Sequence, residues 1–235
     1  MKVEIWSDVM CPFCYTGKRR FENALQQFAH KDEIEVIWKS YQLDSSMQTE
    51  PGKNINQYLA ERKGWTLDYA RQMNAHVTNM AKEVGLHYDF DKAIVANSFD
   101  AHRFSHLAAK YGLGDAAEER FFKAYFTEGK NIADHNTLIQ LGIEIGIDAS
   151  VTKQMLATDA YTYEVQHDIN EAETLGLRGV PFFVMNRKHG VSGAQPEEVF
   201  LKTLEKSFDD WQQEQQQLEL AITEGEVCEP GGDCE

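Results

Sequence analysis

Two cysteines separated by two residues stand near the start of the chain, between a strand pattern and a helix pattern. Residues 2–7 alternate and lead into a short loop, which predicts a buried strand. From Pro12 to about His30 the apolar residues recur at helical spacing, and proline is tolerated in the first turn of a helix. Cys11 and Cys14 are therefore expected at a strand-to-helix junction.

The sheet-forming patterns lie at the two ends of the chain. Glu33–Trp38 alternates again, so the first strand, helix and second strand predict a parallel βαβ unit with a right-handed crossover. Val180–Met185 is a short apolar run, and a further strand is expected through Gly190 and Val191. A helix follows from about Glu197 to Gln217.

The middle of the chain, from about residue 54 to residue 175, shows helical patterns and no convincing strand. Glycines follow most of these patterns, as expected at the ends of helices. We expect an α/β domain, formed by residues 1–50 and 176–217, interrupted by an all-helical insertion over 51–175. The expected helices are Ile55–Lys63, Leu67–Val84, Ala93–Tyr111, Ala116–Thr127, Asn136–Ile145, Val151–Ala157 and Tyr163–Leu175.

The charge of the chain excludes several kinds of partner. The formal net charge is −15, and nine acidic residues but no Lys or Arg follow Lys206. Nucleic acids and anionic membranes need a basic surface, so neither is an expected partner. No window approaches the run of about 20 apolar residues that crosses a bilayer, and no secretion signal precedes Cys11. We therefore expect a cytoplasmic protein, in which cysteines are catalytic or metal-binding rather than structural.

The placement of the first cysteine pair predicts a division of labour between the two thiols. Unpaired N–H groups and the helix dipole at a helix N-terminus favour negative charge, and the thiolate is the attacking species. Cys11 is therefore expected to be the nucleophile. Cys14, one turn later, is expected to face inward and to resolve the mixed disulfide.

Metal binding is the alternative interpretation of these cysteines. Together with Cys228 and Cys234, the first pair offers four thiolates, as a structural zinc site requires. Pro12 and the helix that follows favour redox chemistry over zinc. Two histidines, His102 and His106, are four residues apart on an expected helix, but no third ligand accompanies them. We interpret them as packing or hydrogen-bonding residues and expect no metal.

Four segments together resemble the DsbA-like branch of the thioredoxin superfamily, and within it the FrnE-like subgroup. The resemblance covers residues from about 3 to 210, and implies a thioredoxin-like fold interrupted by a large helical insertion. It also implies a cis peptide bond before Pro181, beside the dithiol. The segments are Asp8–Gly17, with Cys-Pro-Phe-Cys, Asn97–Arg103, Gly179–Val184 and Ser192–Gln195.

The resemblance also implies a substrate-binding surface. The backbone of Val180 would pair with an extended substrate peptide, as in strand addition. From the residues alone, Pro181 would simply begin a strand, a position that proline tolerates. Of the two residues between the cysteines, Phe13 is expected to affect the stability of the Cys11 thiolate most. It offers no charge or hydrogen-bond donor to Cys11.

These features favour thiol–disulfide exchange on disulfide-containing proteins or small thiols, linked to oxidative stress. No cofactor is expected beyond the redox-active disulfide, with glutathione as a candidate reductant. A glutathione-dependent isomerase or transferase, of the 2-hydroxychromene-2-carboxylate isomerase or kappa class, is the main alternative. Such enzymes typically carry a serine where this chain has Cys11 and lack the second cysteine. A non-enzymatic adaptor is a further alternative, which the intact Cys11/Cys14 pair disfavours.

The acidic tail, residues 218–235, contains the second cysteine pair. Cys228 and Cys234 flank Pro230-Gly231-Gly232. This sequence favours a turn, because proline presets φ and glycine permits a positive φ, so the chain can reverse its direction. This predicts a second redox pair that exchanges electrons with Cys11 and Cys14. An inert acidic tail and a zinc pair are the alternatives.

Overall fold

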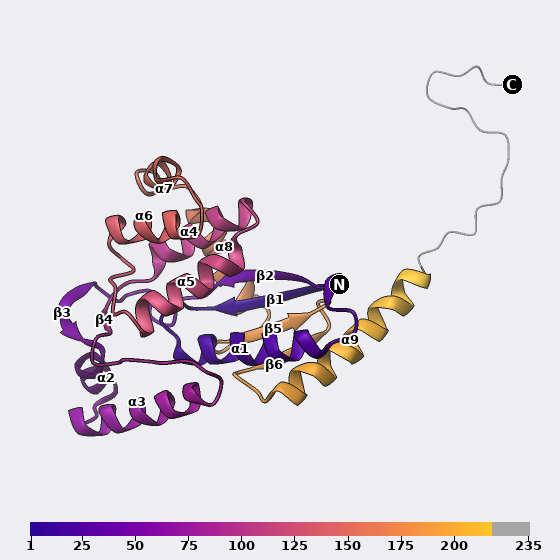
Figure 1. Cartoon of the computed structure of the whole chain (residues 1–235), viewed down its shortest axis with the longest axis horizontal. Coiled ribbons are helices and arrows are strands. Elements are labelled where there is room, and N and C mark those ends of the chain that lie inside the picture. The colour runs from indigo at the N-terminus through magenta and orange to yellow at the C-terminus, as the bar shows by residue number, and fades with distance from the viewer. Residues whose placement is uncertain (218–235) are drawn as a thin grey trace, which may run out of the picture.

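A four-stranded sheet forms the centre of the computed structural model, which describes residues 1–217 (Figure 1). The strand order is β2 (Glu35–Ser40), β1 (Lys2–Ser7), β5 (Phe182–Met185) and β6 (His189–Ser192). Strand β1 pairs in parallel with β2 and antiparallel with β5. The first residues of the chain therefore form a central strand between partners that are near and very far in sequence.

One face of the sheet is covered by α1 (Pro12–Gln27) and α9 (Glu197–Gln217), which lie side by side in Figure 1. Val3 and Ile5 project from β1 into this layer and are completely buried. Because side chains alternate along a strand, these two residues share a face. Aromatic side chains from both helices and from β5 fill the layer, among them Phe21, Phe183, Phe200 and Phe208.

The other face of the sheet is covered by α8 (Thr162–Thr174). Trp6 projects to this side of β1 and is completely buried against Ala172 and Val184. The sheet is thus enclosed on both faces, as expected where a parallel strand pair has helical crossovers.

The segment between β2 and α8 forms a second, mostly helical layer with its own core. The aromatic rings of Phe104, Phe121 and Phe122 are completely buried there. The same core includes Cys11 and Cys14, so the dithiol lies where this layer meets the sheet. Its helices are α2 (Ile55–Lys63), α3 (Leu67–Lys82), α4 (Phe99–Lys110), α5 (Gly114–Phe126), α6 (His135–Glu144) and α7 (Ala149–Leu156).

The expectation of an all-helical insertion is wrong in one respect, because it contains a small antiparallel sheet. Strand β3 (Glu50–Asn54) pairs with β4 (Ile94–Val95). Neither strand shows a usable alternation, since β3 contains Pro51 and Gly52 and β4 has two residues. The helix expected from Ala93 accordingly begins only at Phe99, after β4.

Within residues 1–217, no helix is long and apolar enough to cross a membrane.

Asp168 on α8 joins the insertion to the end of β2. Its carboxylate accepts hydrogen bonds from the Ser40 backbone N–H (2.9 Å) and the Lys39 ammonium (2.7 Å), and lies 3.1 Å from His106 Nε2. Its backbone carbonyl accepts from the Trp6 indole (2.9 Å). Burial opposes the charged carboxylate, but these donors outweigh burial and lower the pKa of Asp168.

Asp168→Asn should lower the free energy of unfolding by about 2–4 kcal/mol at pH 7, because it leaves buried donors without a charged acceptor. A lowered pKa stabilises the fold above the carboxyl's unfolded value of about 3.9, and this stabilisation is lost as the pH falls through the folded value. Urea unfolding between pH 3 and pH 7 should show a shallower acid decline in Asp168→Asn than in the wild type. Asp209→Asn, at an exposed site on α9, is the control and should unfold like the wild type.

Candidate active site

The loop before the dithiol is fixed by the side chain and backbone of Asp8. The Asp8 carboxylate accepts hydrogen bonds from the backbone N–H groups of Met10 (3.2 Å) and Leu43 (2.8 Å). Its carbonyl accepts from the Cys11 N–H (2.9 Å). These bonds turn the chain sharply between β1 and α1. They place Cys11 at the N-cap of α1, with Pro12 in the first turn as the sequence predicts.

The Cys11 thiol meets the segment that precedes β5. Its Sγ atom donates to the carbonyl oxygen of Val180 at 3.5 Å. The peptide bond between Val180 and Pro181 is cis. The structure thus brings together three of the residues singled out from the sequence, although they are about 170 positions apart (the Cys11–Val180 contact spans 169).

Gly17 permits this close approach of the Pro181 loop to α1. A methyl group at Gly17 would lie 2.9 Å from Pro181 Cγ and 3.5 Å from the Ala194 backbone. Glycine inside a helix costs about 1 kcal/mol relative to alanine. The absence of a side chain at Gly17 therefore has a packing role, because it lets Pro181 lie directly against the helix that carries the dithiol.

Cys14 is buried, with 1% of its surface exposed. Burial raises the pKa of Cys14 well above its usual value, and the neighbouring Cys11 raises it further. The nearby Asp8 backbone and Ser7 side chain act in the opposite direction and lower the pKa, but burial outweighs them. Cys14 is therefore a protonated thiol at neutral pH.

Aromatic side chains of the insertion close the far side of the dithiol turn. The Tyr88 hydroxyl donates to the Pro12 carbonyl (2.8 Å) and lies 3.1 Å from the Thr16 hydroxyl. Tyr15 stacks on Phe122 at a centroid distance of 4.9 Å. The first turns of α1 are thus held by the insertion on one side and by Pro181 on the other.

A buried cation strengthens the contact between α1 and α5. Lys18 keeps 2% of its side chain exposed, and its ammonium lies 3.2 Å from both Asp115 and Glu119. Burial alone would lower the pKa of Lys18, but these carboxylates and Glu22 outweigh burial and raise it. Glu119 also accepts from the Tyr15 hydroxyl (2.7 Å). Lys18 therefore fastens α1 to α5 from a buried position.

The two histidines on α4 contact different carboxylates. His102 is buried, and its Nε2 atom lies 3.4 Å from the Asp8 carboxylate beneath the dithiol loop. His106 Nε2 lies 3.1 Å from both Ser40 Oγ and Asp168. Their separate partners agree with the interpretation of both as packing and hydrogen-bonding residues.

A group with metal-binding atoms occurs elsewhere in the described chain. Ligand atoms of His167, Asp168 and Glu171 lie within 4.8 Å of one another. The Lys39 ammonium already lies 2.7 Å from Asp168 and 3.1 Å from Glu171. The Lys39 ammonium therefore neutralises these carboxylates in the place where a metal ion would otherwise do so.

Phe13 lies on the outside of the dithiol turn, with 40% of its surface exposed. An exposed aromatic ring next to Cys11 offers an apolar contact for a substrate. The second cysteine pair, Cys228 and Cys234, lies outside the described residues.

The fold and the dithiol site agree with the match to a family model. The model of the DsbA-like thioredoxin domain matches residues 2–205. The chain belongs to this family.

Individual relatives extend the comparison. A probable DsbA oxidoreductase of Streptomyces coelicolor is 36% identical, with a TM-score of 0.85 over 99% of this chain and 97% of that one. The uncharacterized protein YwbO of Bacillus subtilis is 28% identical over 207 residues, covering 86% of this chain and 94% of the relative. The cytosolic disulfide reductase DsbM of Pseudomonas aeruginosa shares the fold, with 16% identity and a TM-score of 0.62, over 92% of this chain and 100% of that one.

Several residues of the site carry no signal that sequence reasoning recognised. Ser7 ends β1, Asp8 begins the loop after it, and Tyr88 lies in the insertion, so nothing in their spacing predicts contact with the dithiol turn. Gly17 does carry a signal of close packing, since an isolated glycine inside a helix pattern commonly has a packing reason.

Gly17→Ala should slow disulfide exchange by at least about tenfold, because an added methyl group displaces Pro181 from α1 and misplaces the reacting groups. The measurement is the rate of insulin disulfide reduction, alongside thermal unfolding to confirm that the variant is folded. Gly114→Ala is the matched control, since its added methyl group meets Ala109 at an ordinary 3.5 Å. An unchanged rate in Gly17→Ala would show that this close approach is not required.

Proposed function

We propose that the protein is a thiol–disulfide oxidoreductase that works through Cys11 and Cys14 on disulfide-containing proteins or small-thiol disulfides. Membership of the DsbA-like family supports disulfide exchange in general. The observation that carries the specific proposal is the arrangement of the two thiols. Cys11 stands at the N-cap of α1 against the Val180 carbonyl, and Cys14 is buried behind it.

In the proposed reaction, the Cys11 thiolate attacks one sulfur of a substrate disulfide. A mixed disulfide forms, and the first substrate thiolate leaves and takes up a proton. Cys14 then loses its proton and attacks Cys11 Sγ, which releases the second substrate thiol and closes the Cys11–Cys14 disulfide. Two electrons pass from the dithiol to the substrate. The Ser7 side chain and the Asp8 backbone beside Cys14 lower its pKa and so favour this second step.

The dithiol must then be reduced again for a further cycle. We propose a low-molecular-weight thiol such as glutathione as the reductant, and a cytoplasmic location in which disulfides formed by oxidative stress are the substrates. The intact pair of cysteines supports this function over a glutathione-dependent isomerase or transferase of the 2-hydroxychromene-2-carboxylate isomerase or kappa class. It likewise supports exchange over a non-enzymatic adaptor, because an adaptor has no use for two thiols in this arrangement.

Single cysteine variants test the division of labour. Cys14→Ser should accumulate a mixed disulfide through Cys11, because nothing resolves it, and Cys11→Ser should form none. Mass spectrometry of each variant after incubation with oxidised insulin would identify the adducts. In the wild type, the resolution step should accelerate as the pH rises, because the buried Cys14 must lose its proton. Trapping through Cys14 in Cys11→Ser would contradict the assignment.

The tail cysteines are proposed as a second redox pair. In this proposal Cys228 and Cys234 close to a disulfide and pass two electrons to the oxidised Cys11–Cys14 pair. The turn residues Pro230-Gly231-Gly232 between them favour closure of such a loop.

Deletion of residues from 226 onward should slow the re-reduction of Cys11 and Cys14 and leave their single-turnover oxidation unchanged. Stopped-flow thiol measurements with several reductants would separate these two steps. If both rates equal those of the full chain with every reductant, the tail plays no part in the cycle.

A further inference from the structure

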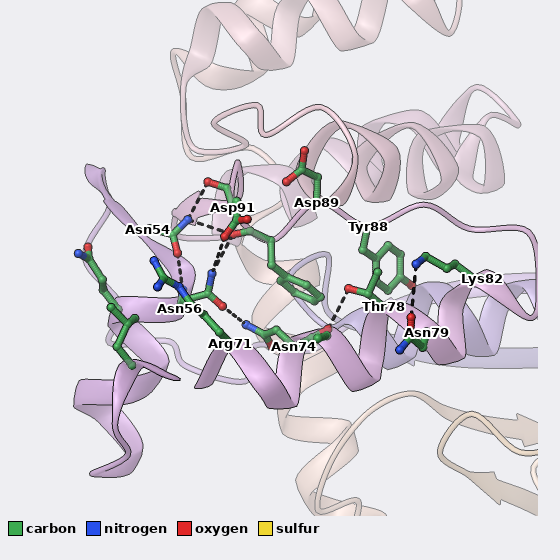
Figure 2. A pocket seen from close by; sticks show the side chains of 14 residues that line it. Asn54, Asn56, Arg71, Asn74, Thr78, Asn79, Lys82, Tyr88, Asp89 and Asp91 are labelled. Atoms are coloured by element: carbon green, nitrogen blue, oxygen red, sulfur yellow. Dashed lines mark hydrogen bonds between the residues drawn. The ribbon is translucent and has the colours of Figure 1, made fainter. Parts of the chain in front are cut away.

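A polar cavity of about 840 Å³ lies between α3 and the segment Tyr88–Asp91 (Figure 2). Helix α3 supplies half of the lining residues, and the start of α2 closes one end. Neither Cys11 nor Cys14 lines this cavity. Its volume is in the range of specific ligand sites.

The floor of the cavity is a chain of buried amide side chains. Asn74 donates to Asn56 Oδ1 (2.7 Å), and Asn56 donates to the Phe90 carbonyl (3.3 Å). Asn56 and Asn74 are 2% and 8% exposed, so the network is fixed in place. Among residues 1–217, no hydrogen bond reaches the Asn74 Oδ1 atom. A fixed amide acceptor is therefore available to a donor within the cavity.

Two cations of α3 line the cavity, on either side of these amides. Figure 2 shows Arg71 and Lys82 on either side of Asn74 and Thr78 along the helix. Arg71 forms no ion pair within residues 1–217, although the chain has a net charge of −15. Lys82 donates to Asn79 (3.3 Å) and likewise forms no ion pair in that part of the chain. The α3 wall thus offers two charged donors to an anionic ligand.

The opposite wall sets the orientation of such a ligand. Asp89 is ion-paired with Lys92 (2.8 Å), and Asp91 accepts from Asn56 (3.4 Å). These carboxylates repel other anions, so the acidic groups of a ligand must face α3. Its N–H groups then face Asp91 on the opposite wall, while the open Asn74 acceptor on the floor can bind a further donor.

Tyr88 links the cavity to the dithiol turn. The ring of Tyr88 lines the cavity, and its hydroxyl donates to the carbonyl of Pro12, the residue after Cys11 (2.8 Å). A chain segment held in the cavity is therefore close to the site where a disulfide would react.

We propose that this cavity binds an extended acidic segment of the disulfide-containing client protein. Two of its carboxylates bind Arg71 and Lys82, and its backbone hydrogen-bonds to the amides between them. Eleven residues of helix place these cations about 16 Å apart along α3. Two acidic residues four positions apart in an extended chain share one face and span about 13–14 Å, and the long basic side chains cover the remainder.

The client assignment rests on the proposed function, whereas binding itself does not require the thiols. The test therefore uses the full chain with Cys11→Ser and Cys14→Ser together, and measures binding of a fluorescent capped peptide, Glu-Ala-Ser-Ala-Glu, by anisotropy. We expect saturable binding that weakens as salt rises and is at least about fivefold weaker for the Gln-Ala-Ser-Ala-Gln peptide. Equal binding of the two peptides would overturn the proposal, whether or not the wild type reduces disulfides.

Variants of the cavity wall locate the binding site. Arg71→Gln and Lys82→Gln should each weaken binding about three- to fivefold, and Lys63→Gln, on α2 outside the lining, should not. Ala75→Trp fills the cavity from an exposed position and should abolish binding without unfolding the chain. Wild-type affinity in Ala75→Trp would overturn the proposal. So would displacement of the peptide by glutathione at equal concentration, since it would assign the cavity to free peptide thiols.

Discussion

The first turns of α1 are held from both sides by parts of the chain that are far apart in sequence. On one side Gly17 lies against Pro181, and the close approach leaves no room for a side chain. On the other side Tyr88 binds the Pro12 carbonyl, and Lys18 inserts between the carboxylates of α5. The position of the dithiol relative to the sheet and to the insertion depends on this double contact.

The same enclosure gives the two thiols different environments. Cys11 begins the helix, where backbone N–H groups are unpaired, and its sulfur touches the carbonyl of Val180. Cys14 lies one turn further into the protein, where burial disfavours a thiolate. Both residues are buried, since 3% of Cys11 and 1% of Cys14 is exposed. The difference between them therefore comes from what surrounds each sulfur, which is the helix N-terminus and the Val180 carbonyl for Cys11 and the buried core with Cys11 itself for Cys14.

The sequence predicts the parts of the site that depend on local pattern. The strand, the dithiol and the helix of residues 2–27 are correctly predicted because each has a strong period or a specific residue at its end. The position of the cis Pro181 beside the dithiol came from family resemblance, since no local pattern links positions so distant. Strands β3 and β4 were missed because their pairing is decided by tertiary contact, and the short segments carry no alternation. The burial of Lys18 was missed for the same reason, because its partners on α5 are remote in sequence.

The pairing of β1 with β5 affects the synthesis of the protein. Val3 is opposite Met185, so the residues between these two partners must leave the ribosome before the strands can pair. Until then one edge of β1 is unpaired, and contacts between such distant residues form slowly. Val180, which contacts the Cys11 thiol, follows Cys11 by 169 positions and emerges long after it. The nascent chain therefore carries the Cys11 thiol without this contact until β5 has been made and has paired with β1.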